Sequence, residues 1–90
     1  MKLREYMTKP TNLNWIIVSL ESGGKHVAVG FKSDRESIRA MKMMSLASTK
    51  TVFNMTHYGY ADEKNLAKYT IIRNPTVNSL LVKKIWKLLK

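Results

Sequence analysis

Hydrophobic and polar positions alternate along two neighbouring stretches near the start of the chain, residues 14–21 and 25–32. A period of two is typical of a β-strand that has one side against a core. Between the stretches stand Ser22, Gly23 and Gly24, and glycines adopt the positive φ that a tight turn needs. The pattern predicts a β-hairpin. Its inward side chains are Ile16, Val18 and Leu20 on the first strand and Val27, Val29 and Phe31 on the second.

A helical pattern follows, from Asp34 to about Ala47. Ser33 and Glu36 have the spacing of a capping box, in which the Ser hydroxyl accepts a hydrogen bond from a backbone N–H three residues on. Apolar and basic positions fall on separate sides of this helix, so it is predicted to be amphipathic. The apolar side holds Ile38, Ala40, Met41 and Met44, and the basic side holds Arg35, Arg39 and Lys42.

Two more strands are predicted at residues 49–58 and 67–73, because both stretches are rich in Thr, Val, Ile, Phe and Tyr. The polar segment between them, residues 61–66, is either a loop or one helical turn.

A second amphipathic helix is predicted to run to the C-terminus. Asn74 is a good N-cap, and Pro75 suits the first helical position. One half of the helix is apolar and the other half is basic, with Leu80 as the apolar exception on the basic side. The apolar half holds Val77, Leu81, Val82, Ile85, Trp86, Leu88 and Leu89, and the basic half holds Lys83, Lys84, Lys87 and Lys90.

These elements predict a single α+β domain over residues 1–90, a two-layer sandwich of ββαββα order. Its sheet would be four-stranded and antiparallel, with both helices on one face. The alternative is a three-stranded sheet with an extra helix at residues 61–68. Residues 1–12 are a lead-in, either a short edge strand at residues 3–7 or a flexible arm.

The net charge is the strongest indication of the kind of partner that the protein binds. Sixteen Lys and Arg face six Asp and Glu, a formal net charge of +10, and residues 64–90 contain no acid at all. Such a one-sided field attracts polyanions, and nucleic acid is the commonest polyanion inside cells. The chain has no cysteine and its N-terminus has no apolar signal segment, so an intracellular, cytoplasmic location is expected.

The candidate contact residues for phosphate are therefore the two basic helix faces and the basic segment before the second helix. Lys and Arg on such faces hold the nucleic-acid backbone without reading sequence. The alternative is that they are ordinary solvated helix faces. These residues are Arg35, Arg39, Lys42, Arg73, Lys83, Lys84, Lys87 and Lys90.

Aromatic side chains form a second candidate surface, because an open sheet face can stack unpaired bases. The candidates are Trp15, Tyr58, Tyr60 and Tyr69. The alternatives are a second small core, or a homodimer interface that hides Trp15 and Ile17.

The sequence contains few residues in the patterns that are typical of catalytic or metal-binding sites. His26 and His57 have no partner at a recognisable spacing, and the adjacent acids Asp62 and Glu63 would point apart on a strand or helix. A small enzyme would have to gather one of these histidines with one of these acids. We expect no cofactor, no metal and no membrane contact.

The sequence thus predicts a non-catalytic nucleic-acid-binding protein, with RNA slightly favoured over DNA because no helix-turn-helix pattern is present. The alternative is a small inhibitor or adaptor, of the kind found in viruses and mobile elements, that docks on an acidic or nucleic-acid-binding surface of a host protein.

Overall fold

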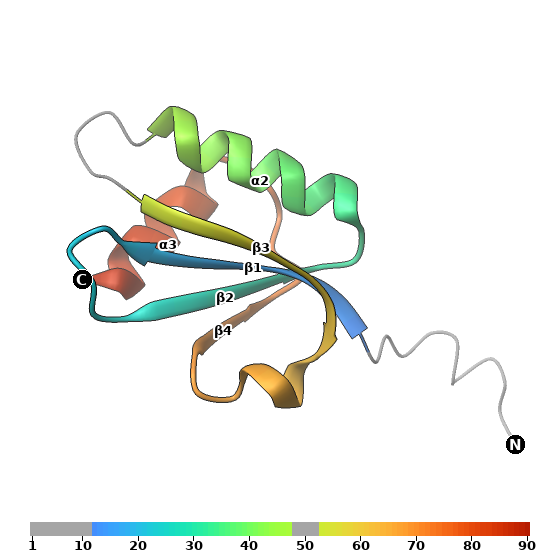
Figure 1. Cartoon of the computed structure of the whole chain (residues 1–90). Helices are drawn as coiled ribbons and strands as arrows, with labels where there is room; N and C mark the ends of the chain where they lie inside the picture. Colours follow the sequence, from blue (N-terminus) through green and yellow to red (C-terminus); the bar gives the residue numbers. More distant parts are fainter. Residues whose placement is uncertain (1–11, 48–52) are drawn as a thin grey trace, which may run out of the picture.

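The structure, a computed structural model, describes residues 12–47 and 53–90, so the predictions for residues 1–11 and 48–52 lie outside the described residues. The described residues form an α+β fold, with a four-stranded sheet and two α-helices (Figure 1). The elements are β1 (Asn12–Leu20), β2 (His26–Phe31), α2 (Asp34–Ala47), β3 (Phe53–Asp62), the 3₁₀ helix η1 (Glu63–Leu66), β4 (Thr70–Arg73) and α3 (Ser79–Leu89).

The predicted β-hairpin is confirmed and forms the centre of the sheet. Strands β1 and β2 pair antiparallel, in a register that places Ser19 opposite His26. Gly23 and Gly24 close the turn with φ angles of 87° and 102°, which are strained for residues with a side chain. Strand β3 pairs antiparallel with the other edge of β1, and β4 lies beside β2, so the sheet order is β3-β1-β2-β4.

The prediction of an antiparallel sheet was wrong, because β4 pairs parallel to β2. The predicted order of elements is matched only in part, since η1 comes between β3 and β4. Strands β3 and β4 both run in the direction of β2, so residues 63–69 must return along the sheet before β4 can begin. Judged by its sequence, a polar connection of this length favours a hairpin, in which the two strands are antiparallel. The parallel direction of β4 was therefore not predicted.

The bounds of the later elements also differ. Strand β3 continues to Asp62, beyond the predicted end at residue 58, and β4 begins at Thr70 instead of residue 67. The polar segment holds one short 3₁₀ turn, and four strands are present, which rules out the three-stranded alternative. Helix α3 begins at Ser79, because Asn78 caps it and not Asn74. Asn74 instead has a φ of 44°, and its N–H donates to Gly30 O at 2.7 Å.

Both helices pack on the same face of the sheet and share one core with it, as predicted. Helix α2 contributes Ala40 and Met44, and its first turn is capped by Ser33, whose Oγ accepts from Glu36 N at 3.3 Å. Ile38 is 42 % exposed, so its assignment to the apolar side was wrong, and Ser37 is buried instead. The full cluster is Ile16, Val18, Val27, Val29, Phe31, Ala40, Met44, Ile72, Leu81, Ile85 and Leu89.

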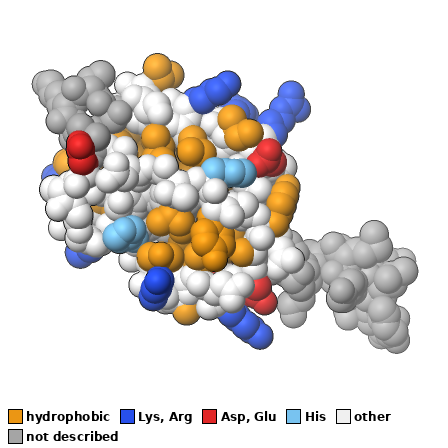
Figure 2. Space-filling model, viewed as in Figure 1, with side chains coloured by type: hydrophobic (Ala, Val, Ile, Leu, Met, Phe, Trp, Pro, Cys, Tyr) orange, Lys and Arg blue, Asp and Glu red, His pale blue; other side chains and the backbone are white. Residues whose placement is uncertain are grey.

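The opposite face of the sheet, which we call the open face, carries a second small core. Trp15 is 0 % exposed, and Leu66 of η1 is packed with it. The indole Nε1 of Trp15 donates to Ala61 O at 2.9 Å. Trp15 is therefore covered within the chain, and the prediction that it stacks on bases was wrong. Figure 2 shows hydrophobic side chains gathered across the middle of this face.

Gly30 is the residue that lets Trp15 lie flat on the sheet. A Cβ at Gly30 would lie 2.7 Å from Trp15 Cζ3 and 2.8 Å from Leu13 Cδ1. We expect Gly30→Ala to lower the free energy of unfolding by about 1–3 kcal/mol, the usual cost of overpacking. Urea denaturation measures it. Trp15→Phe removes the indole atoms of this clash but leaves Leu13 Cδ1. The double variant should therefore lose less stability than the sum of the two single losses. Strict additivity would contradict this packing.

Candidate functional site

The four lysines predicted on the second helix lie together on its exposed side. Burial of Leu81, Ile85 and Leu89 against the sheet turns the opposite side of α3 to solvent. A shallow hollow of about 490 Å³ lies on this surface. Its described lining contains no acid and consists of Leu80, Lys83, Lys84, Trp86, Lys87 and Lys90. We call this set the α3 lysine face.

The floor of the α3 lysine face is apolar. The ring of Trp86 packs edge-on against Phe53, with centroids 6.0 Å apart, and Lys90 Nζ lies 5.3 Å from the Trp86 centroid. Leu80 is 67 % exposed, as its place among the lysines predicted. The surface therefore combines four positive charges with a small apolar area, and can bind an anionic partner that also offers apolar contact.

The basic side of α2 is different, because acids accompany it. Arg35, Arg39 and Lys42 are all exposed, but Asp34 and Glu36 stand in the first turn of the same helix. We call the three bases the α2 basic stripe.

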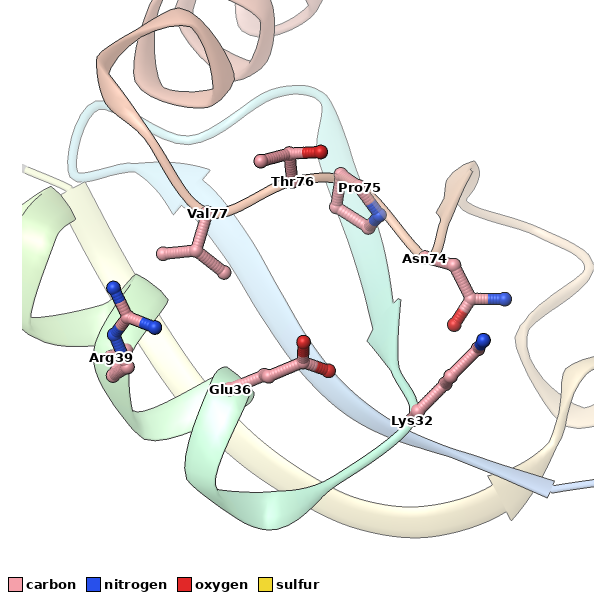
Figure 3. A pocket seen from close by; sticks show the side chains of 7 residues that line it. All are labelled: Lys32, Glu36, Arg39, Asn74, Pro75, Thr76 and Val77. Carbon is pink, nitrogen blue, oxygen red and sulfur yellow. The ribbon is translucent and has the colours of Figure 1, made fainter.

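Figure 3 shows the hollow that Arg39 shares with Lys32 and the loop before α3, with the carboxylate of Glu36 between the two basic side chains. This hollow measures about 420 Å³, and none of its described lining residues belongs to the α3 lysine face. Neither of these two hollows is lined by residues of both basic surfaces.

Arg73 does not offer a free charge. Its Nε and Nη2 donate to the two carboxylate oxygens of Glu63 at 2.5 and 2.7 Å, a bidentate pair. The hydrogen bonds and the negative charge of Glu63 raise the pKa of the Arg73 guanidinium above its ordinary value. Arg73 stays positively charged, but its charge is matched by a carboxylate, so it is a weaker phosphate contact than the sequence suggested. The pairing joins η1 to β4, and no local pattern reveals it.

The predicted stacking residues lie in different places. Tyr58 and Tyr60 are 49 % and 60 % exposed on the edge strand β3, and Tyr60 Oη accepts a hydrogen bond from Asp34 N at 3.2 Å. Tyr69 lies at the other edge of the sheet, beside His26 and Lys68. Sequence reasoning missed the contact of Tyr69 with His26, because the two rings come together only when β2 and β4 pair.

His57 belongs to a polar cluster between β1, β3 and α2. Its Nε2 lies 2.9 Å from Asn14 Oδ1, 3.0 Å from Asp34 Oδ1 and 3.4 Å from Ser37 Oγ. A carboxylate and an amide oxygen only accept, so Nε2 carries the proton. The Ser37 hydroxyl donates its own proton to Asp34 O at 2.7 Å. His57 therefore cannot take the Ser37 proton in this arrangement, and the cluster is not a nucleophile and its base.

The acids proposed for an enzyme are also occupied elsewhere. Asp62 accepts from Lys64 N at 3.1 Å, and Glu63 binds Arg73. Among residues 12–47 and 53–90, no group of three or more His, Asp or Glu side chains is placed to hold a metal ion. Neither helix in this part of the chain is long and apolar enough to cross a membrane.

Comparison with protein-family models, curated proteins and solved structures gives no significant match to this chain.

The His57 cluster supports the fold, because Asn14 and Ser37 are only 1 % and 0 % exposed. We expect His57→Ala to leave Asn14 Oδ1 without a donor and to reduce the free energy of unfolding by about 1–3 kcal/mol. Thr56→Ala, at the exposed neighbouring position, is the control and should change it by about 0.5 kcal/mol or less. Equal effects of the two substitutions in chemical denaturation would show that the cluster does not stabilise the protein.

Proposed function

We propose that this protein is a non-catalytic nucleic-acid-binding protein that holds phosphates on the α3 lysine face. The observation that carries the proposal is the gathering of Lys83, Lys84, Lys87 and Lys90 around one hollow whose described lining has no acid. Phosphate contacts from Lys supply most of the affinity in non-specific binding, because they release condensed counterions.

The kind of side chain on α3 suits backbone contacts better than base reading. An ammonium is a point charge on a flexible stem, whereas bidentate readout of a guanine uses the planar fork of Arg. The proposed binding is therefore independent of base sequence. We favour RNA over DNA, because the exposed rings of Tyr58 and Tyr60 suit unpaired bases and the contacts on α3 do not require a B-form groove.

The α2 basic stripe has a secondary place in this proposal. Arg35, Arg39 and Lys42 are exposed and attract the same polyanion, but Asp34 and Glu36 reduce the local field. Arg73 contributes least, because Glu63 matches its charge.

A second candidate function, docking on an acidic host protein, is supported by the exposure of Leu80. A leucine that is 67 % exposed inside a ring of lysines suits a protein groove with an apolar floor and an acidic rim. Phosphate contacts alone give Leu80 no role.

The nucleic-acid proposal predicts a local effect of charge. We expect replacement of Lys83, Lys84 and Lys87 by Gln to weaken binding to single-stranded RNA. The slope of log K against log salt should flatten by about 2, since each lost phosphate contact is worth about 0.7 on single strands. Fluorescence anisotropy over a series of salt concentrations measures both quantities, and circular dichroism checks the fold.

The matched control replaces Arg35, Arg39 and Lys42 by Gln, which changes the net charge by the same amount. It should weaken binding less than the α3 triple variant. Equal losses would show that only net charge matters. If the unmodified protein binds neither RNA nor duplex DNA with a salt-dependent affinity, the proposed function is wrong.

The single substitution Leu80→Gln separates the two candidate functions. It keeps every charge, so binding to nucleic acid should stay within about twofold if phosphates are the partner. If Leu80 anchors an interface with a protein, the variant should fail to capture a stoichiometric protein partner that the unmodified protein captures from a nuclease-treated lysate. If the variant and the unmodified protein both capture that partner, Leu80 has no role in the second candidate function.

A further inference from the structure

A third hollow lies on the open side of the sheet, where β2 and β4 begin. Because these strands are parallel, their first residues lie at the same end of the sheet, with Val27 opposite Thr70. An antiparallel β4 would have placed the two segments at opposite ends. The hollow measures about 450 Å³, and its described lining residues are Gly24, Lys25, His26, Lys68, Tyr69 and Thr70. We call it the β2–β4 hollow.

Two rings form an aromatic wall in the β2–β4 hollow. The centroids of His26 and Tyr69 are 5.6 Å apart, with the ring planes inclined by 38°. The Nδ1 of His26 lies 3.1 Å from Gly24 O, and since a carbonyl only accepts, Nδ1 carries the proton and the ring orientation is held. In the neutral ring, Nε2 then remains as an acceptor for a donor on a ligand.

The charge of the hollow is positive. Lys25 and Lys68 are exposed, and no acid is among the described lining residues. The Nζ of Lys68 lies 5.2 Å from the Tyr69 centroid. This cation–π contact is weak at an exposed site, so a planar ligand can displace the ammonium from the ring. The freed ammonium then stays close enough to meet an anionic group on the same ligand.

The surroundings also favour a planar, partly apolar ligand. Tyr69 packs on the second core, and Ile71 lies next along β4. Figure 2 shows the hydrophobic band of the open face with a histidine and a basic side chain at its border. The volume is that of a small-ligand site and is too small for a stacked duplex.

We propose that the β2–β4 hollow binds one unpaired nucleotide of a single-stranded nucleic acid. The base stacks on Tyr69 and His26, and the adjoining phosphates meet Lys25 and Lys68. Duplex bases are already stacked and paired, so only a single strand can place a base here. This inference rests on the proposed function for the class of partner, but it uses residues that the α3 lysine face does not contain.

The α3 lysine face alone would not distinguish a single strand from a duplex, because both offer phosphates. A ring that stacks on any base adds preference for unpaired strands with little dependence on sequence. The two surfaces thus have separate roles. The lysines of α3 attract the backbone, and the β2–β4 hollow selects for strands with accessible bases.

The test compares a fluorescein-labelled oligouridine with the same strand annealed to oligoadenine, by anisotropy at low salt. We expect Tyr69→Leu, which keeps an apolar side chain on the second core, to weaken binding of the single strand about tenfold. Binding of the duplex should change less than about twofold, because no base enters the hollow. Tyr69→Phe keeps the ring and should bind both as the unmodified protein does.

A second variant does not disturb the core. Lys25→Gln with Lys68→Gln should weaken single-strand binding more than Lys32→Gln with Lys64→Gln, which removes two lysines outside the hollow. If the unmodified protein binds the oligouridine but all these variants bind it equally well, the β2–β4 hollow has no role while the proposed function stands. If the unmodified protein binds neither probe, the proposed function itself is wrong, and this inference with it.

Discussion

The central strand β1 is buried on both of its faces, and the rest of the structure depends on covering it. Its even-numbered residues Ile16 and Val18 lie under the two helices, and its odd-numbered residues Trp15 and Ile17 lie in the second core. A chain of this size buries a modest share of its surface, so it has little apolar area to spare. Both amphipathic helices are needed on one face, and the return segment with Leu66 is needed on the other.

This requirement decides where the charges lie. Helix α3 uses Leu81, Ile85 and Leu89 for the core, and its lysines are left on the solvent side. The return segment that covers Trp15 also brings Glu63 to Arg73 and starts β4 parallel to β2. One feature of the fold thus pairs Arg73 with a carboxylate and creates a hollow with two lysines and two rings. Basic side chains are therefore exposed at the α3 lysine face, along α2 and around the β2–β4 hollow.

The sequence predicted what short-range patterns can determine. The hairpin, the Ser33 cap and the lysine stripe of α3 depend on residues a few positions apart, and all three are present. Strand direction depends on how the chain crosses the sheet, so the parallel β4 was not predicted. The pairing of Glu63 with Arg73 and the contact of His26 with Tyr69 follow from that crossing. Asn78 caps α3, whereas Asn74 has a positive φ and donates its backbone N–H to Gly30 O.

We propose that nucleic acid meets the α3 lysine face and the β2–β4 hollow. Amide chemical shifts of ¹⁵N-labelled protein, followed by NMR during titration with a short oligouridine, test this claim directly. We expect the shift changes to concentrate on the α3 lysine face, residues 80–90, and on the segments 24–26 and 68–70 of the β2–β4 hollow, with small changes along α2. Shift changes confined to α2, or no changes at saturating oligonucleotide, would contradict this proposal.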